Sequence, residues 1–296
     1  MLINNEFNEQ KIQSPLQYSW TLFTKNNFAM VALWGAFVLV LFALFADVLT
    51  QHTPYDLHPE RLLLPPFWVE GGTIEHIFGT DDLGRDSLAS LIQAFRMTFI
   101  GAIVITLVTA LIGTFIGAAA VLNRGVKSSI LHHLLDALLT MPTLLTTFIL
   151  IVLFGASYEN CLLAVTLSLI PQYIRGIFLT IENELNKQYI TALRLDGATN
   201  YHLLRYGIFP NILEPSVTLL NRIFTMAILE ISTLGFLGFG AQLPELELGS
   251  LIASKLDLIY LSPWLILIPG LTLFLIIIIF NILTEGIRHS LTEGED

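Results

Sequence analysis

The stretch ITALRLDGATNYHLLRYGIFPN, residues 190–211, is a polar interruption between two long apolar runs. It carries the charged or titratable side chains Arg194, Asp196, His202 and Arg205. Just before and within it, apolar side chains recur at spacings of three and four, which predicts an amphipathic helix over residues 182–195 with one stripe formed by Leu185, Tyr189, Ala192 and Leu195. Gly197 favours the end of that helix, because glycine adopts a positive φ without strain.

A second short helix is expected after this glycine. Thr199 or Asn200 is a suitable N-cap for the run YHLLRYGIF, and Pro210 marks the boundary before the next apolar run. Two short helices at an angle would expose a small apolar patch ringed by charge. Such a patch inserts into a groove on a partner or rests on lipid, and the local physics leaves both alternatives open.

The composition indicates an integral membrane protein. Of the 296 residues, 54% are apolar and only 13% are charged, with a mean hydropathy of +0.71, whereas a soluble chain has about a quarter of its residues charged. The net charge of −10 argues against a nucleic-acid partner. The single cysteine, Cys161, excludes a disulfide framework or a cysteine-based zinc site within this chain.

Apolar runs of about 20 residues predict transmembrane helices. The fourth candidate is the weakest, because Pro171, Gln172 and Arg175 lie in its second half, and five spans plus a re-entrant segment is the alternative. The six candidates are Phe28–Thr50, Met97–Leu122, Ile130–Phe154, Asn160–Thr180, Glu214–Leu237 and Pro263–Thr284. The first predicted span is expected to remain in the protein as a membrane anchor. About 27 mostly polar residues precede it, and it lacks the small-residue cleavage site of a signal peptide.

Lysine and arginine near the span ends predict the orientation. With six spans both termini share a side, and that side carries nine of these residues against four on the other. Both termini, and the interruption at residues 190–211, are therefore expected in the cytoplasm. The nine are Lys11, Lys25, Arg124, Lys127, Arg175, Lys187, Arg194, Arg205 and Arg288; the four are Arg61, Arg85, Arg96 and Lys255.

The charged residues inside the predicted spans include Asp136, Arg222 and Glu230. An ionised group at the bilayer centre costs about 2.5–3.5 kcal/mol on insertion scales, so these side chains should face the bundle interior or a watery cavity. One interpretation is a polar path for a cationic or peptide-like solute. The other is a structural ion pair of Arg222 with Asp136 or Glu230.

Patterns typical of catalytic and cofactor sites are absent from the sequence. There is no G-x-x-x-x-G-K-[ST] nucleotide-binding loop, no H-E-x-x-H and no G-x-S-x-G turn. His132 and His133 are neighbours and would point about 100° apart on a helix, which makes them poor co-ligands. We therefore predict no catalytic residue, no metal and no cofactor bound by this chain.

The interruption resembles the cytoplasmic coupling motif of ABC-importer permeases, E-A-A-x-x-x-G followed by I-x-L-P. Ala192, Gly197 and Pro210 match it, whereas Thr191 and Leu193 depart from it. The version typical of peptide transporters, Y-V-x-A-A-R-x-x-G-A-S, is followed more fully. YITALRLDGAT matches it at Tyr189, Ala192, Arg194, Gly197 and Ala198.

Other stretches resemble the same family in the same order. HIFGTDDLGRDSLASLIQAFRMTF, residues 76–99, is similar to its H-x-x-G-T-D-x-x-G-R-D signature, and LLDALLTMPTLL, residues 134–145, to its third span. LGFLGFGAQLP, residues 234–244, is similar to the turn after span five, and NILTEGIR, residues 281–288, to the exit of span six. The chain is identified as a member of the dipeptide and oligopeptide permease family, and within it is most similar to C-type permeases of Sap systems.

The resemblance implies an all-α polytopic membrane bundle of six transmembrane helices with the type I ABC importer fold. It implies a bacterial inner-membrane location, and as partners a second related permease subunit in a heterodimer, two ABC ATPase subunits and a periplasmic solute-binding protein. The implied ATPase-coupling residues are Tyr189, Ala192, Arg194, Gly197, Ala198 and Pro210. From the charged groups within the spans, we expect the translocation path to contain Asp136, Arg222, Met226 and Glu230. The implied division is a cytoplasmic segment 1–27, a first helix and external loop 28–96, a permease core 97–284 and a cytoplasmic tail 285–296.

The function implied is ATP-driven uptake of peptides or of peptide-like or cationic solutes, such as antimicrobial peptides or polyamines. Closure of the ATPases would tilt spans three to five by rigid-body rocking. An ion-coupled carrier or channel without ATPases is the alternative, with Asp136 and Glu230 as ion sites, and a structural scaffold subunit is a third hypothesis. Leu248 and Ser90 depart from many relatives, which bears on the substrate rather than on the family.

Overall fold

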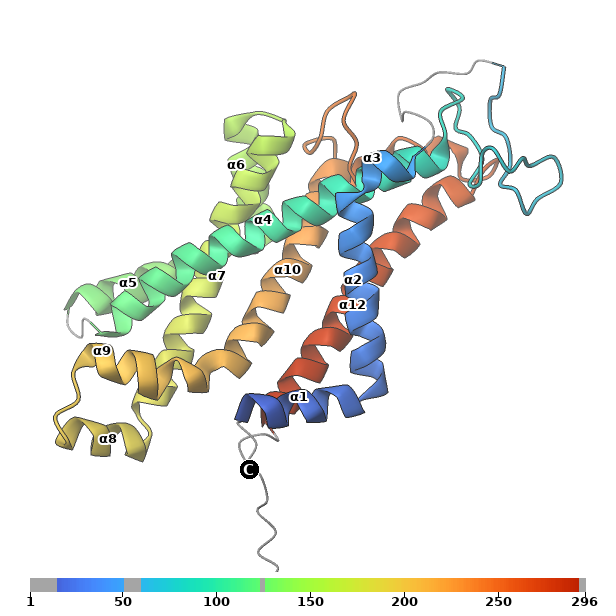
Figure 1. Ribbon diagram of the computed structural model, residues 1–296. Coiled ribbons are helices and arrows are strands. Elements are labelled where there is room, and N and C mark those ends of the chain that lie inside the picture. The colour runs from blue at the N-terminus through green and yellow to red at the C-terminus, as the bar shows by residue number, and fades with distance from the viewer. Residues whose placement is uncertain (1–14, 51–59, 123–125, 293–296) are drawn as a thin grey trace, which may run out of the picture.

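The structure, a computed structural model, describes residues 15–50, 60–122 and 126–292. These residues form helices joined by turns, and within them the only β pairing is an isolated bridge between Thr80 and Asp86. The chain runs through α1 (Pro15–Lys25), α2 (Asn27–Leu44), α3 (Ala46–Leu49), α4 (Ser87–Leu122), α5 (Val126–Leu139), α6 (Thr143–Phe154), α7 (Tyr158–Leu185), α8 (Gln188–Leu195), α9 (Asn200–His202), η1 (Leu203–Ile208), η2 (Pro210–Ile212), α10 (Leu213–Phe236), α11 (Leu248–Ala253), η3 (Leu256–Leu258) and α12 (Trp264–Thr292). Figure 1 shows them as one elongated bundle.

The all-α membrane bundle predicted from the sequence is confirmed. In the described part of the chain, five helical segments are long and apolar enough to cross a membrane, namely α2, α4, α7, the segment Pro210–Phe236 and α12. A sixth crossing is formed if α5 and α6 count as one broken span, bent by 89°.

The break falls in the third span, and the expectation that the fourth would be weakest was wrong. Pro142 lacks an N–H and disfavours helical backbone at Met141, so α5 ends at Leu139 and α6 starts at Thr143. Pro171 instead lies inside the continuous helix α7, a position that membrane bundles tolerate when neighbouring groups satisfy the freed backbone carbonyl.

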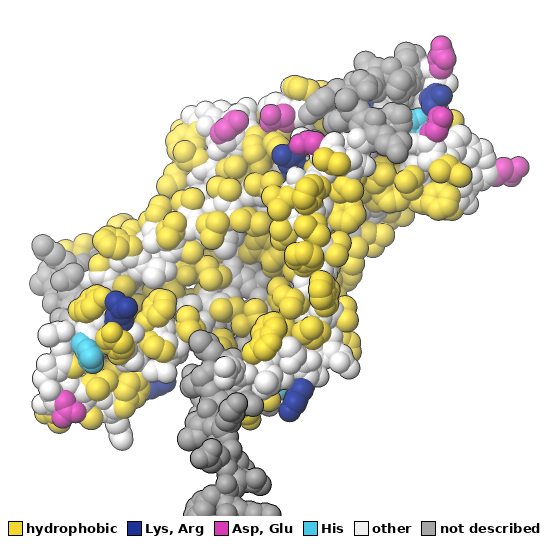
Figure 2. Space-filling model, viewed as in Figure 1, with side chains coloured by type: hydrophobic (Ala, Val, Ile, Leu, Met, Phe, Trp, Pro, Cys, Tyr) yellow, Lys and Arg dark blue, Asp and Glu magenta, His cyan; other side chains and the backbone are white. Residues whose placement is uncertain are grey.

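The core lies where α7 packs against α4 and α10. Gly113 and Gly117 of α4 allow close approach, since a Cβ would lie 2.5 Å from Tyr173 Cδ1 at Gly113 and 3.0 Å from Ile177 Cγ2 at Gly117. The small-residue packing motif GTFIG thus serves helix packing. Apolar side chains also cover the outer surface of the helices (Figure 2), as expected for a face in contact with hydrocarbon.

The two ends of the bundle differ. Figure 1 places α1, the end of α12 and α8–α9 at one end, and α3 with the loop 60–86 at the other. This arrangement agrees with an even number of crossings. The loop predicted to be external contains turns in residues 60–86, and residues 51–59 lie outside the described part. Helix α4 starts at Ser87, ten residues before the predicted span, because Asp86 Oδ2 accepts from Ala89 N at 2.9 Å and caps it.

Candidate functional site

The polar interruption forms a hairpin that we call the α8–η1 hairpin, residues 188–212. The predicted helix 182–195 is broken, because α7 ends at Leu185 and α8 starts at Gln188. The predicted stripe is consequently not one face: Leu185 is buried, whereas Leu195 is 84% exposed. Ile190 supplies the buried contact of α8 instead.

Gly197 ends α8 as the sequence predicts. Its φ is +84°, and the N–H of Ala198 donates to Leu193 O at 3.0 Å while that of Gly197 donates to Arg194 O at 3.1 Å. This is a Schellman cap, which needs a left-handed residue that only glycine adopts cheaply. Of the two N-cap candidates, Thr199 acts: its Oγ1 accepts from His202 N at 3.3 Å.

The Tyr189 hydroxyl connects three short segments, α8, η1 and η2, to the end of α7 at the base of the hairpin. It contacts the buried carboxylate of Glu184 at the end of α7 and lies 2.8 Å from Gly207 O in η1. Asn211 Nδ2 of η2 donates to the same hydroxyl at 2.9 Å and to Gly207 O at 2.7 Å. The hairpin is therefore fixed to α7 by buried polar contacts.

The second half of the hairpin leads directly into α10. Pro210 lies at the boundary before span five, where the sequence predicts it, and it opens the 3-10 turn η2 that continues into α10. The preceding segment η1 is a π-helix, with Phe209 N donating to Leu204 O at 2.8 Å. The proline ring would clash with the carbonyl four residues earlier in an α-helix, and the wider turn relieves this.

Exposed apolar side chains lie along the hairpin, from the end of α8 to the residue before η2. Leu195, Tyr201, Tyr206 and Phe209 are each 60% exposed or more. Cations lie among them: the exposed Arg194 belongs to α8, and Arg205 donates to the Tyr201 hydroxyl at 2.9 Å and lies over the Tyr206 ring at 5.6 Å. We call Leu195, Tyr201, Tyr206 and Phe209 the hairpin patch. Its shape agrees with the prediction of an apolar surface ringed by charge.

The charged residues of the spans are not paired as the sequence suggested. Asp136 of α5 lies 3.4 Å from Arg175 of α7, so the hypothesis of an ion pair between Asp136 and Arg222 was wrong. Arg222 is exposed on α10, Met226 is half-buried and Ala192 of α8 is exposed. The sequence analysis used Arg175 as an obstacle to a span and as one of the cations that predict the orientation, but not as a partner of Asp136.

Glu230 is buried, with 4% of its surface exposed. Its Oε2 accepts from Thr147 Oγ1 of α6 at 2.7 Å and lies 3.4 Å from Ser168 Oγ of α7. Two hydroxyl-bearing residues, rather than Arg222, therefore hold this carboxyl group. Neither stood out in the sequence, because a lone Thr or Ser in an apolar run has no distinguishing pattern.

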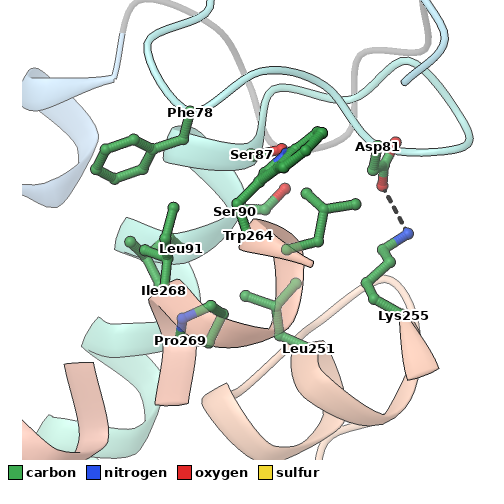
Figure 3. A pocket seen from close by; sticks show the side chains of 11 residues that line it. Phe78, Asp81, Ser87, Ser90, Leu91, Leu251, Lys255, Trp264, Ile268 and Pro269 are labelled. Atoms are coloured by element: carbon green, nitrogen blue, oxygen red, sulfur yellow. Dashed lines mark hydrogen bonds and ion pairs between the residues drawn. The ribbon is translucent and has the colours of Figure 1, made fainter. Parts of the chain in front are cut away.

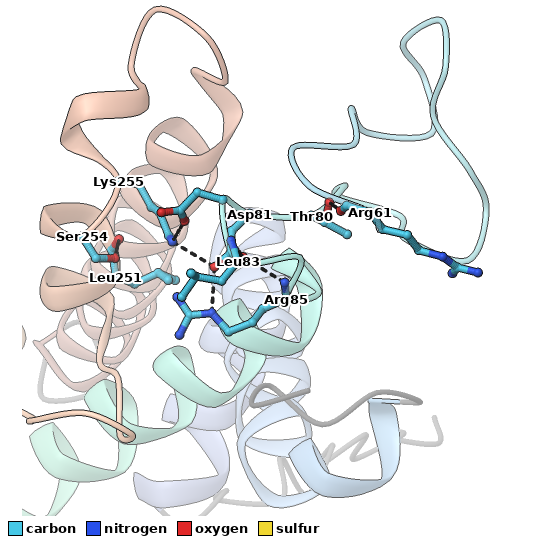
Figure 4. A network of polar contacts seen from close by, with 9 residues as sticks. Arg61, Thr80, Asp81, Leu83, Arg85, Leu251, Ser254 and Lys255 are labelled. Atoms are coloured by element: carbon cyan, nitrogen blue, oxygen red, sulfur yellow. Dashed lines mark hydrogen bonds and ion pairs between the residues drawn. The ribbon is translucent and has the colours of Figure 1, made fainter. Parts of the chain in front are cut away.

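A second polar cluster joins the external loop to the end of the bundle. Lys255, which is 3% exposed, contacts Asp82 and lies 2.9 Å from Asp81 Oδ2, and Arg85 Nε lies 2.8 Å from the same oxygen (Figure 4). Burial alone would raise the pKa of the Asp81 carboxyl, but the hydrogen bond and charge of Lys255, with those of Arg85, outweigh it and hold this pKa below its ordinary value.

Two residues of this cluster, Asp81 and Lys255, line a small pocket between the starts of α4 and α12. Asp81 and Lys255 lie on one side, with Ser90 of α4 and Trp264 of α12 beside them (Figure 3). The motif GTDDLGRD marked this loop in the sequence, but its partner Lys255 could not be found there. Neither this cluster nor any other part of the described residues places three or more His, Cys, Asp or Glu side chains to hold a metal ion.

Comparison with known protein families shows to which family the chain belongs. Residues 111–292 match the model of the binding-protein-dependent transport system inner membrane component, and residues 14–66 match the N-terminal TM domain of oligopeptide transport permease C. This chain belongs to the binding-protein-dependent transport permeases. The first match covers the broken span, the α8–η1 hairpin and the last two spans.

Relatives along nearly its whole length support this placement of the permease. It is 36% identical to the peptide transport system permease protein SapC of Escherichia coli O6:H1, over 99% of both chains. It is 34% identical to the dipeptide transport system permease protein DppC of Escherichia coli K12, over 94% of this chain and 93% of that one.

Solved structures show the same fold. The permease aligns with a chain of the MetNI methionine ABC transporter in an inward-facing conformation, with a TM-score of 0.56 at 15% identity, over 68% of this chain and 95% of that one. The type I importer fold is thereby confirmed.

The chain is thus a multi-pass inner-membrane permease subunit of an ABC importer, a transport component rather than an enzyme. Its family works with ATPase subunits and a substrate-binding protein. The alternative of an ion-coupled carrier or channel without ATPases is not supported by these relatives.

Proposed function

We propose that this permease is one half of a heterodimeric pore for peptides or for peptide-like or cationic solutes, with both termini in the cytoplasm. A second related permease subunit completes the pore. Two ATPase subunits bind on the cytoplasmic side, and a periplasmic binding protein delivers the solute outside. This chain itself binds no nucleotide, metal or other cofactor.

The observation that supports this proposal is the α8–η1 hairpin. It carries an exposed apolar patch at the end of the bundle where α1 and the end of α12 also lie (Figure 1). It continues without a loop into α10. A partner that moves the patch therefore moves a membrane-spanning helix directly.

The coupling residues have different parts in this proposal. Gly197 and Ala198 form the cap that sets the angle of the hairpin, and Tyr189 fixes its base to α7. Pro210 joins it to α10. The exposed residues Ala192 and Arg194 lie where an ATPase surface would contact α8.

The translocation path is proposed along α10 and α5. Arg222 is exposed near the middle of a span, and an arginine there is costly to place against hydrocarbon. It is satisfied if this face of α10 borders the second subunit or a watery cavity. Met226 lies one turn further along, and Asp136 of α5 is half exposed. Glu230, being buried, does not face an open cavity in this structure.

The substrate class rests on the relatives. Both SapC and DppC are named as peptide or dipeptide transport permeases. Antimicrobial peptides and polyamines are the cationic members of the proposed class.

We also propose the division of the chain into segments 1–27, 28–96, 97–284 and 285–296.

The test is a Leu195→Asp substitution in the complete, co-purified transporter. Leu195 is 84% exposed, so the change should leave folding intact. If the hairpin patch docks on an ATPase, a charge at its most exposed side chain should weaken ATPase association by about tenfold or more and abolish ATP-driven uptake into vesicles.

The matched control is Leu261→Asp. Leu261 is 68% exposed but follows α11, toward the external end, and this variant should bind ATPases as the parent does. Normal ATPase association and uptake in Leu195→Asp would refute the proposal, as would uptake by the permease without ATPases.

A further inference from the structure

The upper half of the broken third span, α6, is weakly attached to the bundle. Of its twelve residues, only Thr147 and Ile151 are buried. Leu145, Val152 and Leu153 are exposed. An apolar helix in a bilayer gains little from burying such side chains against others, because lipid is equally apolar. The position of α6 therefore depends on its few specific contacts.

One of those contacts is polar and joins three helices. Thr147 Oγ1 of α6 lies 2.7 Å from Glu230 Oε2 of α10 and 2.6 Å from Ser168 Oγ of α7. Ser168 Oγ lies 3.4 Å from the same Glu230 oxygen. In an apolar interior, water cannot replace a hydrogen bond that a carboxyl group loses, so breaking such a bond costs more free energy than at the surface.

The helix that carries Glu230 is also the helix that continues from the hairpin. The path from η1 through η2 into α10 contains no loop, and Glu230 lies 20 residues after Pro210 on it. Any tilt of α10 displaces the Glu230 carboxyl group, and this group contacts α6 through Thr147 and its neighbour one turn earlier, Thr143.

We propose that Glu230 is a positioning residue, which transmits movement of α10 to α6 through Thr147 and Ser168. In this arrangement α6 moves with α10 as one body, and the break at residues 140–142 is the hinge that lets α5 move separately. Glu230 then acts inside the bundle and not by contacting solute. This inference rests on the proposed function, because it assumes that the hairpin drives α10.

The test uses the complete transporter and two substitutions at this position. Glu230→Gln keeps the shape and the hydrogen-bonding groups, whereas Glu230→Leu keeps the bulk and loses them. We expect Glu230→Leu to lower the solute transported per ATP hydrolysed by roughly fivefold, as expected for the loss of an ordinary hydrogen bond. Glu230→Gln should restore most of it. Thr147→Val, which removes the facing hydroxyl, should behave like Glu230→Leu and serves as the second variant if that one fails to assemble.

A structural readout separates transmission from mere stability. Spin labels at Leu153→Cys in α6 and Leu237→Cys after α10, both at exposed positions, in a Cys161→Ala background, report the distance between these helices. In the parent this distance should be equal in the nucleotide-free and ATP-bound states, and in Glu230→Leu it should differ or broaden.

The outcomes separate this inference from the proposed function. A parent complex without ATP-driven transport would overturn the proposed function. A parent that transports, together with a Glu230→Leu variant of normal coupling and an unchanged distance, would overturn only the role of Glu230. A distance that changes between states in the parent would do the same, since α6 and α10 would then not move as one body.

Discussion

At the residue scale, Gly197 shows most clearly how one amino acid shapes the hairpin. A Cβ at this position would meet nothing within 4 Å, so space does not require a glycine. The φ of +84° does, because an L-residue pays about 1–2 kcal/mol in this region and a β-branched one pays more. Asparagine is the side chain best tolerated there.

We predict that Gly197→Val lowers binding-protein-stimulated ATP hydrolysis in the assembled transporter several-fold, because the cap would open and the hairpin would lose its angle. Gly197→Asn should stay close to the parent. Gly270→Val is the control: it too has open space around it but lies within helix α12 and has no positive φ. An equal loss of stimulated ATP hydrolysis in the Gly197→Val and Gly197→Asn variants would show that the positive φ at this position is not required for coupling.

At the element scale, buried contacts between segments decide where each helix ends and what it holds. The external loop 60–86 has no helix or strand of its own, and it is attached through Asp81 and Lys255 to the segment after α11. Removing one partner of a buried ion pair leaves an uncompensated charge and costs about 3–5 kcal/mol. An exposed pair is worth about 0–1 kcal/mol.

Lys255→Met should therefore loosen the attachment of the loop to the bundle, because Lys255 is the cation that joins Asp81 to the segment after α11, whereas Arg85, the other cation at Asp81, belongs to the loop itself. Limited proteolysis and hydrogen exchange over residues 60–86 should rise strongly, with a lower melting temperature of the complex. Arg61→Met, which breaks the exposed Arg61–Glu75 pair of the same loop, should change little. Unchanged protection in Lys255→Met would mean that other contacts hold the loop.

At the scale of the whole molecule, the arrangement assigns the hairpin and the loop 60–86 to opposite sides of the membrane. Figure 1 shows them at opposite ends of the bundle, and the excess of lysine and arginine predicts that the hairpin end is cytoplasmic. The single cysteine, Cys161, is buried, which makes the chain suitable for single-cysteine labelling.

In a Cys161→Ala background, we expect Glu70→Cys to react with a membrane-impermeant maleimide added to intact cells. Leu195→Cys should react only after the inner membrane is permeabilised. Both positions are exposed, so accessibility within the protein does not limit the reaction. Labelling of Leu195→Cys in intact cells would place the hairpin outside and remove its access to any ATPase.

The sequence by itself determined the membrane spans, the family and the glycine-capped hairpin. These follow from local properties: hydropathy is summed over a run of about 20 residues, and a preference for positive φ belongs to one residue. For the same reason, the sequence predicts Thr199 as an N-cap candidate and a helix that includes α8. It does not predict the break between α7 and α8 at Asn186 and Lys187.

Only the tertiary structure decided which proline breaks a helix and which charged groups meet. Pro142 divides the third span whereas Pro171 is accommodated in α7, because the outcome depends on the neighbours that satisfy the freed backbone groups. Likewise Lys255 meets Asp81 across 174 positions of sequence. A buried charge takes the partner that packing brings within reach, and the order of residues along the chain does not record that distance.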